Sequence, residues 1–109
     1  MMERSKKHLF DILFSIDVIF EFIGDLNFIE YEKDLKTKSA VERQLGIIGE
    51  ALNNFSKDTD NVNITSAREI INLRNRLVHA YDSVDDSIIW AIKTNHLPVL
   101  KKEINKLLE

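Results

Sequence analysis

The chain has 109 residues, which is enough for one compact domain and too few for two, and it contains no cysteine. The missing thiols exclude disulfides, thiolate catalysis and cysteine-ligated zinc, and they fit a reducing compartment. A net charge of −3 argues against a broad basic surface that coats nucleic acid, although a small basic cleft is compatible with it. Three glycines and one proline leave little material for tight turns. We therefore predict an all-α single domain over residues 1–109.

The first predicted helix covers residues 4–24 and is apolar on more than one side. One stripe at helical spacing suits a core, and four more apolar side chains lie off it: Phe10, Phe14, Val18 and Phe22. Such a helix is either central in a bundle or shared with another subunit, and we predict a homodimer. Acidic residues interrupt the apolar run, so it resembles neither a signal sequence nor a membrane span, and we expect a cytoplasmic protein.

A connection over residues 25–38 is predicted to contain the start of the second helix. Ser39 and Glu42 have the spacing of a capping box, although the helix could begin a turn or two earlier. Its buried stripe is regular and consists of Val41, Leu45, Ile48, Leu52 and Phe55.

Two glycines lie inside this second helix, where each is less favourable than alanine by roughly 1 kcal/mol. We expect Gly46 and Gly49 to be tolerated because another helix approaches closely. Glu50 either faces the motif described below or is an ordinary solvated carboxylate, and the sequence alone favours the second interpretation.

After a polar loop at residues 56–63, Ser66 and Glu69 predict a second capping box at the start of the third helix. This helix is expected to end near residues 79–82. Residues 83–86 should cap a fourth helix, with acidic groups in its first turn. Pro98 should break or kink that helix before a last segment at residues 97–108. The result is an up-and-down bundle of four to five helices.

The end of the third helix carries the most distinctive polar side chains of the chain. At about 100° per residue, positions 75 and 79 lie one turn apart, and positions 74, 78 and 81 form the adjacent row. Arg74, Asn75, His79 and Tyr81 therefore share one edge if the helix persists to its end.

This set of side chains suits metal-free cleavage of RNA. The guanidinium of Arg74 fits phosphate oxygens, and His79 can exchange protons near neutral pH. A histidine would deprotonate the 2′-OH, and Asn75 could orient the imidazole or a ligand. A partner acid would have to come from elsewhere, for example from a second subunit. Alternatively, Arg74 and His79 only satisfy the free carbonyls at a helix end, and Tyr81 only packs.

Residues 71–81 closely resemble the signature of HepT-like proteins in the HEPN superfamily, and residues 41–52 resemble that family's second helix. Trp90 and the Leu97-Pro98 pair fit as well, so the resemblance covers nearly the whole chain. It implies a homodimeric helical bundle that acts as the toxin of a type II toxin–antitoxin pair. Its usual partner is MntA, a minimal nucleotidyltransferase antitoxin.

By this resemblance Arg74 and His79 are the ribonuclease residues and Asn75 supports them. Tyr81 matches the tyrosine that the partner modifies with AMP, which silences the toxin. A bulky anion beside the cationic residues would block phosphate entry. Some relatives are described only as nucleotidyltransferase-associated proteins. The alternative is therefore a non-catalytic adaptor or substrate-binding subunit of a minimal nucleotidyltransferase.

Other candidate residues carry weaker signals. His8 and His96 lack a second ligand at suitable spacing, so we expect no metal site, and no cofactor motif is present. Helix capping explains Asp85 and its acidic neighbours better than a metal does. Basic side chains could make a cleft around the motif locally positive: Arg68, Arg74, Arg76 and Lys93.

Overall fold

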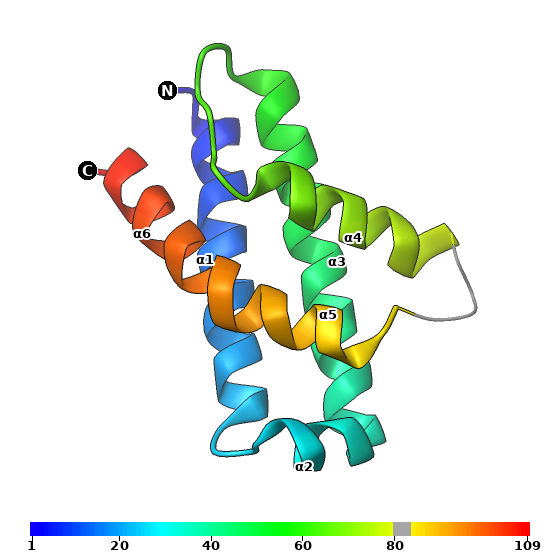
Figure 1. Ribbon diagram of the computed structural model, residues 1–109. Helices are drawn as coiled ribbons and strands as arrows, with labels where there is room; N and C mark the ends of the chain where they lie inside the picture. The colour runs from blue at the N-terminus through cyan, green and yellow to red at the C-terminus, as the bar shows by residue number, and fades with distance from the viewer. Residues whose placement is uncertain (80–83) are drawn as a thin grey trace.

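The computed structural model describes residues 1–79 and 84–109, and every regular element within them is helical (Figure 1). In chain order the elements are α1 Glu3–Ile23, α2 Phe28–Lys33, α3 Leu35–Asp58, α4 Ala67–His79, α5 Asp86–Ala91, η1 Ile92–His96 and α6 Leu97–Leu107. The element η1 is a π-helical turn. The predicted all-α bundle is confirmed.

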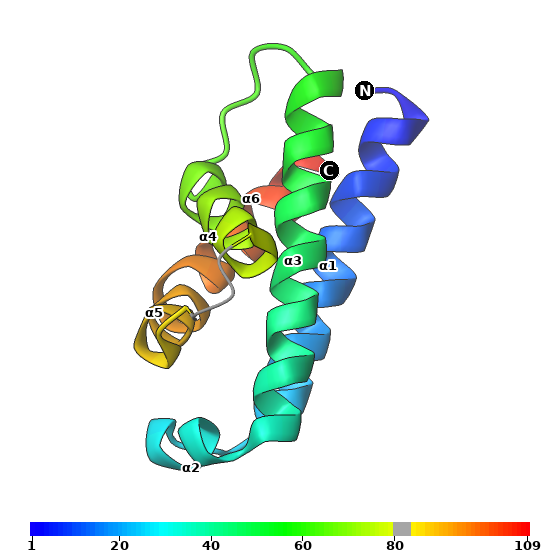
Figure 2. The ribbon, with the colours of Figure 1, turned by 90° about the vertical axis from the view of Figure 1, so that its right-hand side faces the viewer.

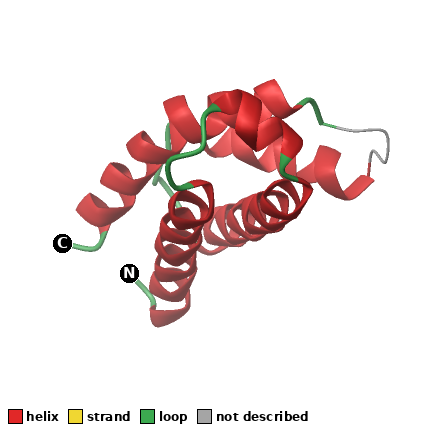
Figure 3. Ribbon diagram, turned by 90° about the horizontal axis from the view of Figure 1, so that it is seen from below, coloured by secondary structure: helices red, strands yellow, loops and turns green. Residues whose placement is uncertain are grey.

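The two longest helices, α1 and α3, lie side by side, and α4 and the α5–η1–α6 segment cross them on one side (Figures 1 and 2). Seen from below, the crossing helices form a second layer over the α1–α3 pair (Figure 3). The core lies between these layers and is built from the regular apolar stripes, among them Ile12, Ile16, Leu45, Ile48 and Ile70. In the described residues, no helix is long and apolar enough to cross a membrane.

The outer side of α1 is apolar and exposed, as its second stripe predicts. Phe14 is 68% exposed and Phe10 57%, while Phe22 is exposed to 44% and Val18 is half-buried. The alternative of a central helix buried on all sides is therefore wrong for the single chain. The homodimer remains a prediction.

The connection before α3 contains a complete short helix that the sequence pattern did not separate. Asn27 accepts a hydrogen bond from the Glu30 amide, and Glu30 accepts one from the Asn27 amide, which is a capping box for α2. Asp34 then caps α3 by accepting from the Thr37 amide and hydroxyl. The cap predicted at Ser39 is wrong, and the alternative of an earlier start is confirmed, because the helix begins about one turn earlier at Leu35.

Of two further caps, the one at Ser66 differs from the prediction and the one at α5 lies within the predicted segment. The hydroxyl of Ser66 lies 2.8 Å from Nδ1 of His96, so it joins α4 to η1 instead of forming a box with Glu69. At α5 the cap within the expected segment is Asp85, whose carboxylate accepts from the amide of Ser87. In both cases the residue types were right for a helix start. A tertiary contact decided the partner of Ser66, and a local one decided that of Asp85.

Pro98 does not break the last helical segment. It occupies the first turn of α6, where its missing N–H costs no intrahelical bond, and the π-helical turn η1 immediately precedes it. The π-helical turn η1 joins α5 directly to α6, so one continuous helical segment crosses the bundle (Figure 1).

Candidate functional site

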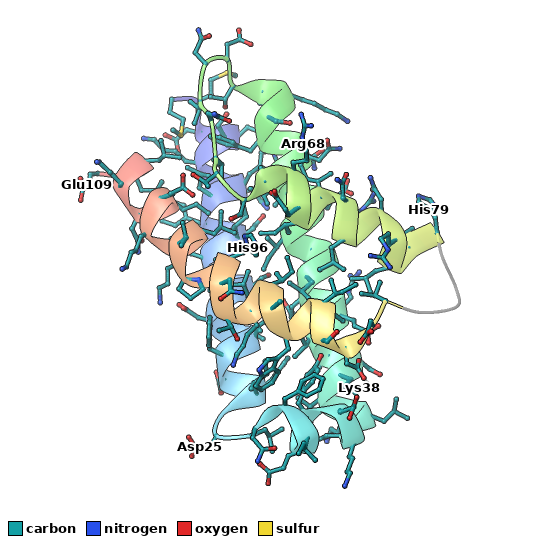
Figure 4. The ribbon with its side chains drawn as sticks, viewed as in Figure 1. Asp25, Lys38, Arg68, His79, His96 and Glu109 are labelled. Atoms are coloured by element: carbon teal, nitrogen blue, oxygen red, sulfur yellow. The ribbon has the colours of Figure 1, made fainter. Side chains whose placement is uncertain are left out.

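Helix α4 carries the predicted motif on the side that faces away from the core. Its inner residues Ile70 and Leu73 are buried, whereas Asn75 and His79 are exposed and Arg74 lies between these two environments. The helix persists to His79, as the shared edge requires. Figure 4 shows His79 at the end of α4 far from Arg68. Tyr81 lies outside the described residues.

The guanidinium of Arg74 is held from two directions. Its Nη1 donates to the side-chain oxygen of Asn75 at 2.9 Å, and its Nη2 lies 2.6 Å from Oε2 of Glu50 on α3. The Arg74 side chain is 27% exposed and the Glu50 side chain 49%. The guanidinium is therefore fixed in position and still reaches solvent, as a phosphate-binding group must.

Gly49 makes the contact between Glu50 and Arg74 possible. A Cβ added at Gly49 would overlap the Cβ of Arg74 and would lie 2.9 Å from its Cγ and 3.3 Å from the carbonyl oxygen of Ile70. Only glycine allows α4 to approach α3 this closely. The close approach expected at this glycine is confirmed.

The favoured interpretation of Glu50 as an ordinary solvated carboxylate is wrong, because Glu50 pairs with Arg74. The sequence did contain a signal for this pair, because the glycine directly before Glu50 marks the point where two helices cross. The second glycine behaves differently, since a Cβ at Gly46 would meet no atom within 4 Å. The close approach expected at Gly46 is therefore wrong within the described structure.

A hollow of about 480 Å³ opens beside Arg74 between α1, α3 and α4. We call it the Arg74 hollow, and its ionisable lining residues are Lys7, His8, Asp11, Arg43, Glu50 and Arg74. A smaller recess of about 210 Å³ shares Arg43, Gly46 and Val78 with it and reaches Leu77. Val78, the residue before His79, lines both hollows.

The basic residues around the hollow are only partly those that the sequence indicated. Lys93 lies elsewhere, with its Nζ 3.8 Å from the centroid of the Trp90 ring, and burial lowers its pKa. Arg68 and Arg76 are exposed and do not line the Arg74 hollow. Arg43 and Lys7 take their place, although they come from other helices and no local pattern links them to the motif.

The two remaining histidines are already engaged. Nε2 of His8 lies 3.3 Å from Oδ2 of Asp58, and Nδ1 of His96 lies 2.8 Å from the Ser66 hydroxyl. Across residues 1–79 and 84–109, no cluster of three or more histidine, aspartate or glutamate side chains is arranged to hold a metal ion. His79 is thus the histidine on the motif edge.

An all-helical fold with an arginine and a histidine on one helix edge is typical of the HEPN class. The model of the family described as "Ribonuclease HepT-like" matches residues 12–107. The chain belongs to this HepT-like family.

Named relatives agree with this assignment. The chain is 38% identical over 108 residues to "Probable ribonuclease HepT" of Thermococcus cleftensis, covering 97% of this chain and 98% of the relative. It is 37% identical over 102 residues to "Putative RNase MJ0127" of Methanocaldococcus jannaschii, covering 93% and 84%. A third relative, "Putative RNase TTE0752" of Caldanaerobacter subterraneus, is 29% identical over 109 residues, or 99% of this chain and 97% of the relative. No solved structure gives a significant match to the chain.

Proposed function

We propose that this chain is the toxin of a type II toxin–antitoxin pair and cleaves RNA without a metal ion. The observation that carries the proposal is the Arg74 guanidinium, held between Asn75 and Glu50 at the rim of a hollow. Membership of the HepT-like ribonuclease family supports it. Arg74 binds the scissile phosphate, and His79 exchanges a proton with the reacting ribose and phosphate.

The reaction breaks one phosphodiester bond and needs no external nucleophile. The ribose 2′-oxygen loses its proton and attacks the adjacent phosphorus, and the 5′-oxygen of the next nucleotide leaves and gains a proton. The products are a 2′,3′-cyclic phosphate and a 5′-hydroxyl. Negative charge on the phosphate oxygens is stabilised by Arg74, whose five donors are arranged to bind them.

The exposed phenylalanines of α1 support a homodimer. Phe10, Phe14 and Phe22 present large apolar side chains on the side of α1 opposite the core, and self-association would remove them from water. Phe14→Asp should shift the chain to the monomer in sedimentation equilibrium. Ile29→Asp on α2, also at an exposed apolar residue, is the control and should leave association unchanged.

A nucleotidyltransferase antitoxin of the MntA type is the proposed partner, and Tyr81 is its proposed target. Transfer of AMP to Tyr81 would place a bulky anion two residues from His79 and inactivate the toxin. Co-expression with a nucleotidyltransferase of the MntA type should raise the intact mass of this chain by one AMP group. The increase should disappear in Tyr81→Phe, and an unchanged wild-type mass would refute the modification.

Cleavage of RNA by the purified chain in excess EDTA tests the central proposal. We expect His79→Ala to lower kcat by roughly 10²–10⁴-fold, the usual contribution of a proton-transfer group, without a change in thermal unfolding. Wild-type protein that leaves RNA intact in the absence of its partner would support the non-catalytic adaptor instead.

A further inference from the structure

The proposed cleavage needs two proton transfers, and the motif edge provides one histidine. A base must take the proton of the 2′-OH, and an acid must protonate the leaving 5′-oxygen on the opposite side of phosphorus. His8 and His96 are engaged with Asp58 and Ser66. A second subunit could supply the other group, and so could a side chain of the same chain that contacts Arg74.

Glu50 meets the requirements for this group. Its Oε2 lies 2.6 Å from Nη2 of Arg74, so a phosphate bound by the guanidinium would lie next to the carboxylate. The Glu50 side chain is 49% exposed and lines the Arg74 hollow, which leaves it accessible to a ribose hydroxyl. Asp11 also lines the hollow, but its carboxylate pairs with Lys7 at 2.8 Å, whereas Glu50 pairs with the proposed phosphate-binding group.

The positions of Glu50 and His79 suit opposite sides of one phosphate. His79 lies five positions after Arg74, which corresponds to about 7.5 Å of rise along α4. Glu50 contacts the Arg74 end of this interval, and Val78, next to His79 in the chain, lines the smaller recess. An in-line displacement requires the attacking and leaving oxygens to lie on opposite sides of phosphorus, and groups at the two ends of this interval would suit that requirement.

We propose that Glu50 is the general base of the cleavage and that His79 is the general acid, an assignment that rests on the proposed ribonuclease function. The Glu50 carboxylate accepts the 2′-OH proton while the 2′-oxygen bonds to phosphorus. The bond from phosphorus to the 5′-oxygen breaks, and that oxygen takes a proton from the His79 imidazolium. Solvent then restores the two side chains to their starting protonation states. No second histidine is needed.

This assignment reverses the role that the sequence indicated for the histidine, and the pH profile distinguishes the two. With Glu50 as base and His79 as acid, kcat/KM falls across the neutral pH range, because the acid must carry its proton. With His79 as base, kcat/KM rises across that range instead. A wild-type profile that rises there would overturn the proposal.

Glu50→Gln tests the carboxylate directly, because the amide oxygen can still accept from Arg74 but cannot take a proton. We expect kcat to fall by roughly 10²–10⁴-fold with little change in KM. Asp11→Asn is the matched control in the same hollow and should stay within a few-fold of wild type. Glu50→Gln with nearly wild-type kcat would exclude the base role.

An RNA with sulfur in place of the 5′-oxygen at the mapped cleavage position separates base from acid. A thiolate leaves without protonation, so this substrate needs the base and not the acid. His79→Ala should regain most of its activity on it, and Glu50→Gln should not. The opposite pattern would assign the base role to His79. Wild-type protein that cleaves neither RNA would overturn the proposed function together with this inference.

Discussion

Two ion pairs along α3 differ in their surroundings. One holds two helices together and is called the brace below, and the other belongs to the candidate functional site. Near the start of α3, Lys38 Nζ lies 2.8 Å from Oδ2 of Asp86, and the two side chains are only 22% and 16% exposed. Twelve residues later, Glu50 pairs with Arg74 at 49% and 27% exposure. An ion pair thus joins two helices at both positions, but only the second pair lines the Arg74 hollow, where a ligand could reach it.

The neighbours of each pair explain this difference. The ring of Trp90, on the same helix as Asp86, packs 5.3 Å from Tyr31 and 5.7 Å from Phe28 between centroids. Burial raises the pKa of Tyr31, and the carboxylate of Asp86 adds to this effect. Among residues 1–79 and 84–109, no Phe, Tyr or Trp lines the Arg74 hollow, and a Cβ at Gly46 would meet no atom within 4 Å.

Removal of the guanidinium should have the largest effect. Arg74→Ala should reduce RNA cleavage by at least 10²–10³-fold, on the order expected for one group that stabilises the developing phosphate charge. Arg76→Ala is the matched control, because Arg76 lies exposed on the same helix outside the hollow. Gel assays of a labelled RNA measure both, and equal losses would exclude a specific role for Arg74.

The two glycines of α3 should respond in opposite directions. Gly49→Ala should lower the free energy of unfolding by about 1–3 kcal/mol, because its Cβ would overlap Arg74 and force α4 away. Gly46→Ala should be neutral or stabilising by up to about 1 kcal/mol, since alanine favours the helix and its Cβ meets open space. Urea unfolding compares them, and equal destabilisation would contradict the crossing at Gly49.

The Lys38–Asp86 brace should affect stability and not chemistry. Asp86→Asn should cost about 1 kcal/mol, because it leaves a lysine with little exposure without its carboxylate. Asp17→Asn removes the pair with Lys101, whose side chains are 45% and 59% exposed, and should change stability by less than about 0.5 kcal/mol. Equal costs in urea unfolding would show that burial does not distinguish these pairs.

A smaller, pH-dependent effect is expected at Glu42, beside the same brace. Burial, followed by the Asp86 carboxylate, raises the Glu42 pKa above 4.5, so the folded state binds this proton more tightly than the unfolded state. Stability from this group is present below about pH 4.5 and is lost as pH rises through the folded pKa.

Glu42→Gln removes this pH-dependent loss of stability. The variant should be more stable than wild type at pH 7 by less than about 1 kcal/mol, and the difference should vanish toward pH 4. Glu21→Gln on the exposed side of α1 is the control. Thermal unfolding between pH 4 and 7 measures both, and a gap that widens at low pH would contradict the raised pKa.

The fold was largely predictable because helices depend on local spacing. Apolar residues at intervals of three and four marked the inner stripes of α1, α3 and α4, and these stripes are buried. Arg74, Asn75 and His79 share an edge because a helix places them there, whatever packs behind it. The short α2 was missed because six residues carry too little periodicity, although Asn27 and Glu30 had the spacing of a cap.

Contacts between helices were decided only by the tertiary structure. Glu50 and Arg74 are 24 residues apart, and no local rule relates two helices until their crossing point is known. Gly49 fixes that crossing point, because there is no space for a side chain at this position. The contact between Ser66 and His96 likewise joins residues that are far apart in the sequence. The sequence by itself therefore determined the helices, their inner faces and the motif edge. The tertiary structure decided which carboxylate meets the arginine and where the hollow opens.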